Sequence, residues 1–140
     1  MKCKIEKARL SGKIVCPPNK SYTHRAIFLS TLAKGKSKIS NVLLSRDTIA
    51  TINACKNFGA QINIDGSNLT IESSGNINLQ SSQIDASNSG TTIRIAAAIS
   101  SLSDNKITLS GDASLQKRPM QLLLDALESL GASCTSTDGK

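Results

Sequence analysis

Aromatic side chains are scarce in this sequence, whose 140 residues include no tryptophan, one tyrosine and two phenylalanines. A module that binds single-stranded nucleic acid stacks bases on exposed aromatic rings, so this composition argues against one. The hydrophobic fraction of 39% is enough for one core, because a domain of about this length buries roughly 68–70% of the surface that its unfolded chain exposes. That core has to be built from Ile, Leu, Ala and Val, which suits helices packed on sheets.

Histidine and cysteine form no pattern that a metal site or a disulfide framework would need. His24 is the one histidine and has no cysteine near it, while Cys3, Cys16, Cys55 and Cys134 are scattered without a C-x-x-C pair. Neither a zinc site nor a set of structural disulfides is therefore predicted. Apolar runs of the length of a signal core or a membrane span are also missing, so we expect a cytoplasmic protein.

Acidic residues are outnumbered, with 17 lysines and arginines against 10 aspartates and glutamates and a formal net charge of +7. This excess favours anionic partners, either polymers or small molecules. The basic residues gather at predicted helix starts and form no stripe, which favours small anions over nucleic acid.

Hydrophobic periodicity predicts alternating helices and strands, and hence an α/β fold. The prediction is an extended segment over 3–15 with a break at Gly12, helices over 21–33, 47–58, 88–99 and 118–132, strands over 38–42 and 106–112, and a hairpin formed by 61–64 and 68–72. Ser45 or Asp47 is expected to cap the start of the second helix.

Two stretches of the chain resemble each other at a spacing of about 70 residues. "NKSYTHR" (19–25) matches "NSGTTIR" (88–94), and "INACKNFGA" (52–60) matches "LDALESLGA" (124–132). We therefore predict two repeated units, 16–80 and 81–140, preceded by a separate segment, 1–15. The alternative is that amphipathic helices ending in glycine simply look alike. The second unit stops before a strand that the first contains, so we expect a partial chain.

The segment "CPPNKSYTHR" (16–25) combines a helix start with basic side chains. The two prolines forbid helix upstream, so the helix is predicted to begin between Asn19 and Ser21. Lys20 and Arg25 then lie near the positive end of the helix dipole, where acids are preferred. An anion bound there removes this conflict. The alternative is a capping serine beside two solvated bases.

Two further segments have a similar character. Asn88 to Thr92 is a polar helix entry in which Gly90 lets the backbone approach a ligand, and Arg118 precedes Pro119, which suits a first helical turn. We predict that these three helix starts converge on one anion-binding cleft, although ordinary caps and a basic loop would give the same pattern. Asp47 is expected to be a cap or a solvated charge, and His24 an exposed side chain without a catalytic role.

Four segments, in this order and spacing, resemble the 5-enolpyruvylshikimate-3-phosphate synthase (3-phosphoshikimate 1-carboxyvinyltransferase) family. They are "PNKSYTHRA" (18–26), "LLSRDTIATINACKNFGA" (43–60), "SNSGTTIR" (87–94) and "LSGDASLQKRPMQLLLDALESLGA" (109–132). The resemblance covers the whole chain but only about the first third of such an enzyme. It implies an α/β fold of repeated βαβαββ units, with about two units of an N-terminal substrate-binding domain present here and residues 1–15 pairing partly with a second domain.

The resemblance also implies roles for residues. Lys20, Ser21 and Arg25 would bind shikimate 3-phosphate, and Lys20, Gly90 and Arg118 would bind phosphoenolpyruvate. The remaining candidates in the same loops are Asn88, Thr91 and Asp47. Two departures from the family pattern are Ile95 in place of a proline common in bacterial members, and Asp47 standing alone, after Arg46, where a pair of acids is usual.

The implied reaction transfers the enolpyruvyl group of phosphoenolpyruvate to the 5-hydroxyl of shikimate 3-phosphate, through a tetrahedral intermediate that loses phosphate. It needs no metal or organic cofactor, and it belongs to the shikimate pathway of aromatic amino-acid biosynthesis. The implied partners are small anionic substrates, with no nucleic acid or membrane, in a protein that is monomeric at full length. The catalytic residues are expected in a second domain, so these 140 residues should bind substrate weakly and not turn over.

Three other functions stay open. The UDP-N-acetylglucosamine enolpyruvyl transferases share the fold, but their reactive cysteine would fall near Ser114. The other two are a basic nucleic-acid-binding module and a folded half that binds substrate without catalysis.

Overall fold

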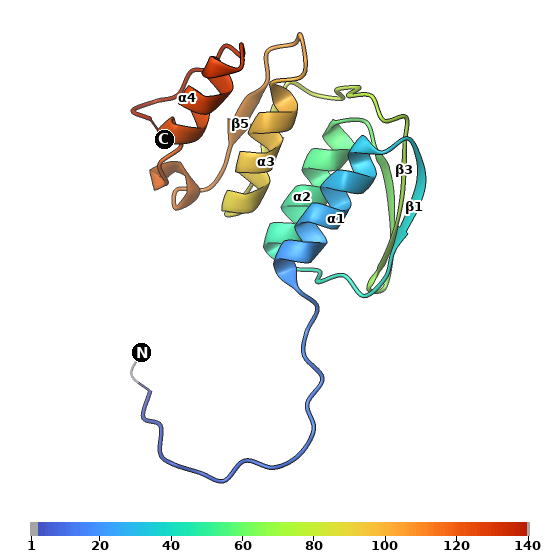
Figure 1. The fold of residues 1–140 in the computed structure, drawn as a ribbon, viewed down its shortest axis with the longest axis vertical. Helices are drawn as coiled ribbons and strands as arrows, with labels where there is room; N and C mark the ends of the chain where they lie inside the picture. The colour runs from blue at the N-terminus through green and yellow to red at the C-terminus, as the bar shows by residue number, and fades with distance from the viewer. Residues whose placement is uncertain (1–2, 140) are drawn as a thin grey trace.

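The computed structural model describes residues 3–139, and their folded part is a layer of helices packed on two small sheets. In chain order the elements are α1 (Lys20–Leu32), β1 (Gly35–Ile39), α2 (Arg46–Asn57), β2 (Gln61–Asp65), β3 (Asn68–Ser73), β4 (Gln83–Asp85), α3 (Gly90–Ser100), β5 (Thr108–Ser110), the short 3-10 helix η1 (Leu115–Lys117) and α4 (Gln121–Ser129). Helices α1, α2 and α3 run in the same direction, and residues 3–19 project from the start of α1 as a tail (Figure 1). Of the helices over 3–139, none has the length and apolar character to cross a membrane.

The start of α1 is set by a local cap. The side-chain oxygen of Asn19 accepts a hydrogen bond from the backbone N–H of Tyr22 at 2.9 Å, which satisfies one of the donors that a helix start leaves unpaired. The predicted start between Asn19 and Ser21 is thereby confirmed. Lys20, Ser21 and Arg25 fall on the exposed face of the helix, where they are available to a ligand.

Helix α2 also begins and ends by local rules. Ser45 and Thr48 form a capping box at its start, so Ser45 is the cap among the two predicted candidates. After the helix, Gly59 has φ +100, a conformation that other residues rarely adopt. A β-carbon at this glycine would lie 2.7 Å from the backbone oxygen of Asn78, so the position excludes a side chain on two grounds.

Replacing Gly59 with alanine is therefore expected to destabilise the fold by about 3 kcal/mol, through backbone strain and the displacement of Asn78. Gly35→Ala is the matched control, because Gly35 has φ +115 but a β-carbon there would meet no other atom within 4 Å. That control carries strain alone, about 1–2 kcal/mol. Urea unfolding of both variants measures the difference, and equal losses would show that the contact with Asn78 contributes nothing.

The first sheet has the strand order β1-β3-β2, with both neighbouring pairs antiparallel. The predicted hairpin of β2 and β3 is confirmed. The strand predicted over 38–42 is displaced and occupies Gly35–Ile39. The positive φ of Gly35 lets the chain enter the strand soon after α1, and Asn41, with φ 55, ends the extended run before Val42.

The second sheet pairs β4 with β5 in parallel, and α3 makes the crossover between them. The sequence predicted β5 but missed β4, because its three residues are too short to show a period. The two sheets fall in the two predicted units, but the unit boundaries stay a prediction.

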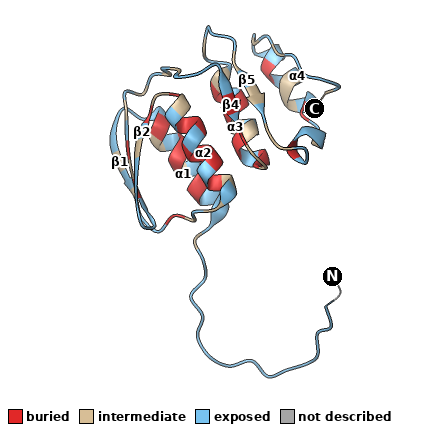
Figure 2. Ribbon diagram, turned by 180° about the vertical axis from the view of Figure 1, so that it is seen from behind, coloured by how far each residue is buried: buried red, intermediate tan, exposed pale blue. Residues whose placement is uncertain are grey.

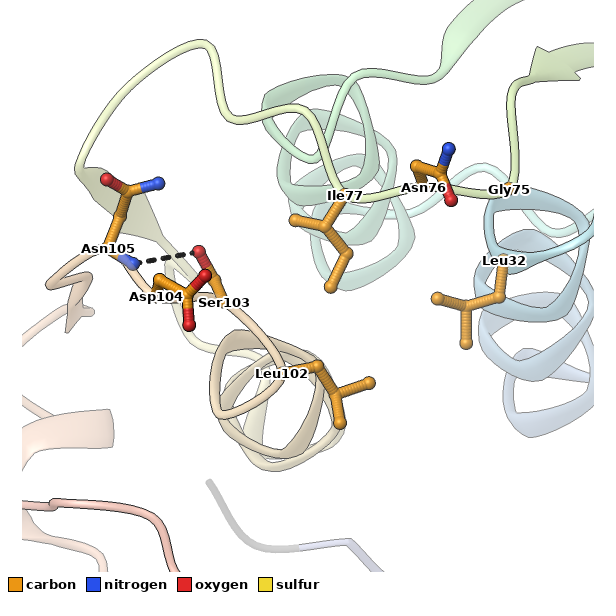
Figure 3. Close-up of a pocket in the computed structure, with 8 residues that line it drawn as sticks. All are labelled: Leu32, Gly75, Asn76, Ile77, Leu102, Ser103, Asp104 and Asn105. Carbon is orange, nitrogen blue, oxygen red and sulfur yellow. Dashed lines mark hydrogen bonds between the residues drawn. The ribbon is translucent and has the colours of Figure 1, made fainter.

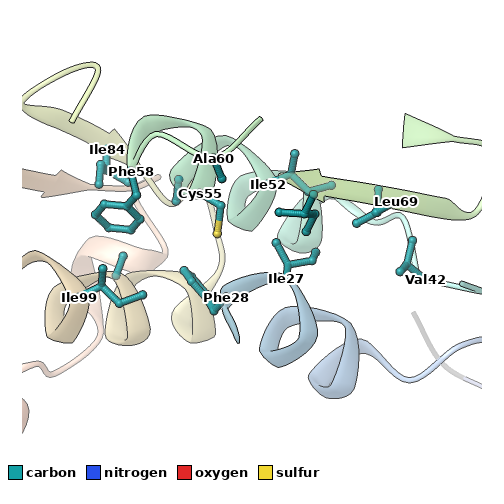
Figure 4. Packing of buried hydrophobic residues seen from close by; sticks show 13 residues of the cluster. Ile27, Phe28, Val42, Ile52, Cys55, Phe58, Ala60, Leu69, Ile84 and Ile99 are labelled. Atoms are coloured by element: carbon teal, nitrogen blue, oxygen red, sulfur yellow. The ribbon is translucent and has the colours of Figure 1, made fainter. Parts of the chain in front are cut away.

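The main hydrophobic core lies between the helices and both sheets, and it connects the predicted units. Its buried side chains come from α1, α2, α3 and the strands, and the tail stays exposed (Figures 2 and 4). Phe28 and Phe58 are its two large aromatic side chains, and the rest of the cluster is Ile, Leu, Val, Ala and one cysteine, as the composition predicted. The core thus holds α1, α2 and α3 together along their length.

The last helix differs from its prediction. Helix α4 begins at Gln121 rather than 118, because the preceding residues form η1 and a turn. The carboxylate of Asp112 accepts hydrogen bonds from the backbone N–H groups of Ser114 and Leu115 and so initiates η1. Arg118 therefore follows η1 as its C-cap, and its predicted position in the first turn of α4 is wrong.

Candidate anion-binding site

The N-terminal ends of α1, α2 and α3 lie at the same end of the helical layer, where the tail also joins (Figure 1). Each helix start carries a partial positive charge from its aligned peptide dipoles. The predicted convergence of helix starts is thus seen for α1 and α3, with α2 between them. Arg118 joins them from a loop and not from a third predicted helix start.

Lys20 is brought to Asp47 across the gap between α1 and α2. The ammonium nitrogen lies 2.7 Å from a carboxylate oxygen of Asp47, and about half of the lysine side chain stays exposed. Asp47 was predicted to be a cap or a solvated charge, whereas Ser45 caps α2 and Asp47 pairs with Lys20. The contact holds the lysine at the helix start, and its solvent exposure leaves room for an anion to bind it.

The other two predicted residues of α1, Ser21 and Arg25, are exposed on the same helix. The guanidinium of Arg25 lies 4.9 Å from the centre of the Tyr22 ring, a cation–π contact that orients the group and leaves its charge uncompensated. Thr91, a further candidate at the start of α3, is also exposed.

A chain of polar contacts orients Arg118. Its Nη2 donates to the side-chain oxygen of Asn88 at 2.8 Å. The amide nitrogen of Asn88 in turn donates to both carboxylate oxygens of Asp112, at 2.9 and 2.7 Å. Asp112 thus determines which side of the Asn88 amide carries the NH₂ group and which the oxygen. The oxygen of Asn88 then holds the guanidinium toward the start of α3.

Gly90 lies under two guanidinium groups. A β-carbon at this position would lie 2.8 Å from Nη1 of Arg118 and 2.9 Å from Nη1 of Arg94. Arg94 also donates to the backbone oxygens of Gly90 and Pro119, each at 3.3 Å. The missing side chain therefore makes the space that both arginines occupy.

Uncompensated positive charge is the main electrostatic feature of this end of the molecule. Within residues 3–139 the ion pairs are Lys4 with Glu6 and Lys20 with Asp47, so Arg25, Arg94 and Arg118 have no carboxylate partner. Cations held in place without a partner are suited to binding a carboxylate or a phosphate.

His24 is buried, with 1% of its surface exposed, so its predicted exposure is wrong. Hydrophobic residues at neighbouring positions of α1 place this face of the helix against the core. A hydrogen bond of 2.6 Å between Nδ1 and the hydroxyl of Thr51 offsets the cost of burying the polar ring. Burial lowers the pKa of His24 below its ordinary value, Asp47 opposes that shift, and Lys20 adds to it. The imidazole is therefore neutral at physiological pH.

Two pockets along residues 3–139 lie elsewhere. One, of about 340 Å³, is at the opposite end of the helical layer, beyond the last residues of α1 and α3 (Figure 3). The other, of about 470 Å³, is a shallow depression over the first sheet. Neither is lined by a residue that the sequence predicted to be functional, and both lack the clustered cations of the helix starts.

Sequence reasoning missed two residues that shape the site, Arg94 and Asp112. Arg94 matches Arg25 in the internal repeat, and that match could have identified it. Asp112 stands in "SGDAS", a turn sequence in which aspartate commonly accepts bonds from the backbone two or three residues later. Its contact with Asn88, 24 residues earlier, has no signal in the sequence.

Asp112 is expected to make stability depend on pH in the acid range. The hydrogen bond from Asn88, followed by the one from Leu115, lowers the pKa of this carboxyl below its ordinary value. The unfolded chain then binds more protons than the folded one, so the contribution is present above pH of about 4 and is lost as the pH falls below it. Urea unfolding between pH 5 and pH 3 should show a flatter profile for Asp112→Asn and for Asn88→Ala than for the wild type. Identical profiles in all three proteins would contradict the assignment.

Solved structures show the class of fold to which this arrangement belongs. The chain superposes on EPSP synthase from Acinetobacter baumannii with a TM-score of 0.82 and 30% sequence identity, covering 91% of this chain and 30% of that one. The fold is therefore that of an enolpyruvyl transferase, and the predicted fold class is confirmed.

Sequence comparison identifies the family. The model of the EPSP synthase (3-phosphoshikimate 1-carboxyvinyltransferase) family matches residues 5–140, and the chain belongs to that family. It is 61% identical to the 3-phosphoshikimate 1-carboxyvinyltransferase of Nitrosopumilus maritimus over 100% of this chain and 33% of the relative. It is 46% identical to the enzyme of the same name from Methanosarcina mazei, over 99% of this chain and 32% of that one. The chain thus spans about a third of the length of these relatives.

Proposed function

We propose that this chain is the substrate-binding N-terminal part of an enzyme that transfers the enolpyruvyl group from phosphoenolpyruvate to the 5-hydroxyl of shikimate 3-phosphate. The observation that carries the proposal is the group of uncompensated cations at the starts of α1 and α3, in a chain of the EPSP synthase family. Both substrates are polyanions, so an enzyme that joins them has to offset their repulsion.

The proposed division of roles follows the two helix starts. Lys20, Ser21 and Arg25 on α1 bind shikimate 3-phosphate. Gly90 and Arg118 bind phosphoenolpyruvate, and Lys20 reaches both substrates. Bringing the substrates to adjacent helix starts orients the reacting atoms and offsets charge before any bond forms.

Asp47 and Asn88 support these roles. Asp47 holds the ammonium of Lys20 at 2.7 Å, and a substrate phosphate would bind the exposed side of the same ammonium. Asn88 keeps Arg118 directed at Gly90 through a 2.8 Å hydrogen bond. Thr91 is exposed beside them on the first turn of α3 and can donate its hydroxyl to a bound anion.

We infer that the full-length protein acts in the cytoplasm as a monomer without nucleic-acid partners. All four cysteines of the chain are free thiols, which suits a reducing compartment. The cations gather at helix starts and not along an extended stripe, which suits small ligands better than a polymer.

The UDP-N-acetylglucosamine enolpyruvyl transferases are the second candidate. Ser114 stands where their reactive cysteine would fall, and the relatives named above act on shikimate 3-phosphate by name. Both facts favour the first candidate.

Titration with shikimate 3-phosphate, followed by NMR, tests the proposal. We expect shifts at the start of α1 in the wild type, and at least about tenfold weaker binding in Lys20→Ala and Arg25→Ala. Lys36→Ala is the control, because Lys36 is an exposed lysine on β1. Equal responses of all variants would overturn the proposal, as would shifts with UDP-N-acetylglucosamine and none with shikimate 3-phosphate.

Turnover is tested in two proteins. The 140-residue chain is expected to release no phosphate from the two substrates. A chimera in which it replaces the matching third of the Nitrosopumilus maritimus relative is expected to release phosphate, and an inactive, folded chimera would count against the proposed roles.

A further inference from the structure

Four buried side chains form a continuous hydrogen-bond chain through α1, α2 and α3. Nδ1 of His24 lies 2.6 Å from the hydroxyl oxygen of Thr51, which lies 2.7 Å from that of Thr92. Thr92 donates to the hydroxyl of Ser89 at 2.7 Å, and Ser89 caps α3. All four residues are at most 1% exposed, so solvent cannot substitute for any of these bonds.

The protons of this chain have one consistent arrangement. The hydroxyl of Thr92 donates to Ser89 at 2.7 Å and, at 3.4 Å, to the backbone oxygen of Asp47. Its single proton is therefore not available to Thr51, so the hydroxyl of Thr51 has to donate to Thr92. Thr51 then has only lone pairs left for His24, and Nδ1 of His24 has to be the donor. The neutral ring therefore carries its proton on Nδ1, and Nε2 is an unprotonated nitrogen that is buried without a hydrogen-bond partner among residues 3–139.

The two ends of the hydrogen-bond chain, His24 and Ser89, lie at the two helix starts that form the candidate site. His24 lies on α1 between Lys20 and Arg25, and Ser89 immediately precedes Gly90. The serine oxygen also accepts the backbone N–H of Thr92 at 3.1 Å, which sets the first turn of α3. A change at His24 can thus reach the start of α3 through two hydroxyls, without touching any ligand.

We propose that His24 is a positioning residue, whose Nδ1–H orients the Thr51–Thr92–Ser89 hydroxyl chain and thereby holds the start of α1 in register with the phosphoenolpyruvate-binding start of α3. This inference rests on the proposed function of the two helix starts. It assigns His24 no contact with substrate and no proton transfer.

The charged groups that face His24 keep its role compatible with physiological pH. Lys20 faces it from α1 and Asp47 from α2. The residue of α3 in the hydrogen-bond chain, Thr92, is uncharged. The unfolded chain protonates its imidazole near pH of about 6.5 but the folded chain does so only at lower pH, so stability falls as the pH drops below about 6.5. His24 is the one histidine of the sequence, so His24→Asn should abolish this slope between pH 7.5 and pH 5.5.

The first measurement is the tautomer. A proton–nitrogen correlation spectrum of the single imidazole is expected to show the proton on Nδ1 at pH 7.5. A proton on Nε2 would overturn the proposal directly, whatever the chain binds.

The second measurement is phosphoenolpyruvate binding by the 140-residue chain, followed at the Gly90 amide in the presence of shikimate 3-phosphate. Thr51→Val removes the central hydroxyl at constant shape, and Thr31→Val is the matched control because Thr31 is buried on α1 and its hydroxyl donates to Ile27 in its own helix. We expect about tenfold weaker binding in Thr51→Val and less than about twofold change in the control.

Substitutions of His24 complete the test. The amide nitrogen of asparagine can take the place of Nδ1, so His24→Asn is expected to bind phosphoenolpyruvate within about threefold of the wild type, whereas His24→Phe is expected to lose about tenfold. If Thr51→Val and His24→Phe bind as the wild type does, the positioning role is overturned and the proposed function stands. If the wild type binds neither substrate, the proposed function is overturned and the positioning role with it.

Discussion

Replacing Arg118 with alanine is expected to weaken phosphoenolpyruvate binding by about 100-fold, because a held, uncompensated guanidinium is lost from the site. The side chain has one of its donors on Asn88 and no carboxylate partner within residues 3–139. Arg118→Lys should restore little of the loss, since an ammonium cannot make two parallel hydrogen bonds to a carboxylate or phosphate. The Michaelis constant for phosphoenolpyruvate in the chimera measures the effect.

Lys117→Ala is the matched control for this prediction. Lys117 carries the same charge at the neighbouring position and is exposed at the end of η1. Its removal should change the Michaelis constant less than about twofold, as expected for a solvated charge. Comparable losses in Arg118→Ala and Lys117→Ala would mean that net charge matters and the geometry around Asn88 does not.

Gly90→Ala is expected to weaken phosphoenolpyruvate binding by about tenfold to 100-fold while leaving the fold intact. The added β-carbon would lie 2.8 and 2.9 Å from the two guanidinium groups, which are the ends of flexible side chains and can move. Neither group can then stay over the start of α3. Shikimate 3-phosphate binding should change little, because its proposed residues lie on α1.

A double-mutant cycle separates displacement of the arginine from any other effect of the methyl group. In an Arg118→Ala background, Gly90→Ala should add little to the loss, because the group it displaces is already absent. Full additivity of the two losses would contradict this explanation. Thermal unfolding is the accompanying control, and a melting temperature lower by more than about 8 °C would show that the fold itself had been damaged.

Local chemistry made most of the fold predictable. The helix starts at Asn19 and Ser45 follow from side chains that accept the first backbone N–H groups, and the hairpin of β2 and β3 follows from Asp65-Gly66 between alternating residues. These signals act within a few residues, so they do not depend on the tertiary structure. The three-residue strand β4 had no such signal.

The two errors that concern the site have different causes, one local and one tertiary. The displaced start of α4 reflects the turn that Asp112 initiates, which also moved Arg118 from a helix start into a loop. The buried position of His24 depends on the hydroxyl of Thr51 on α2, which forms a hydrogen bond with the imidazole and with Thr92 on α3. A sequence window around His24 contains neither Thr51 nor Thr92, whereas Asp112 and the N–H groups of Ser114 and Leu115 lie within three residues of one another.

The sequence by itself determined which residue types this protein offers to a ligand: a lysine, a serine and an arginine at one helix start, and a glycine with an asparagine at another. Caps, prolines and glycines are local, so they set where those helices begin. Only the tertiary structure decided how the groups meet. The pairing of Lys20 with Asp47 spans 27 residues and that of Asn88 with Arg118 spans 30, and contacts at such separations exist only once the core has packed α1, α2 and α3 side by side.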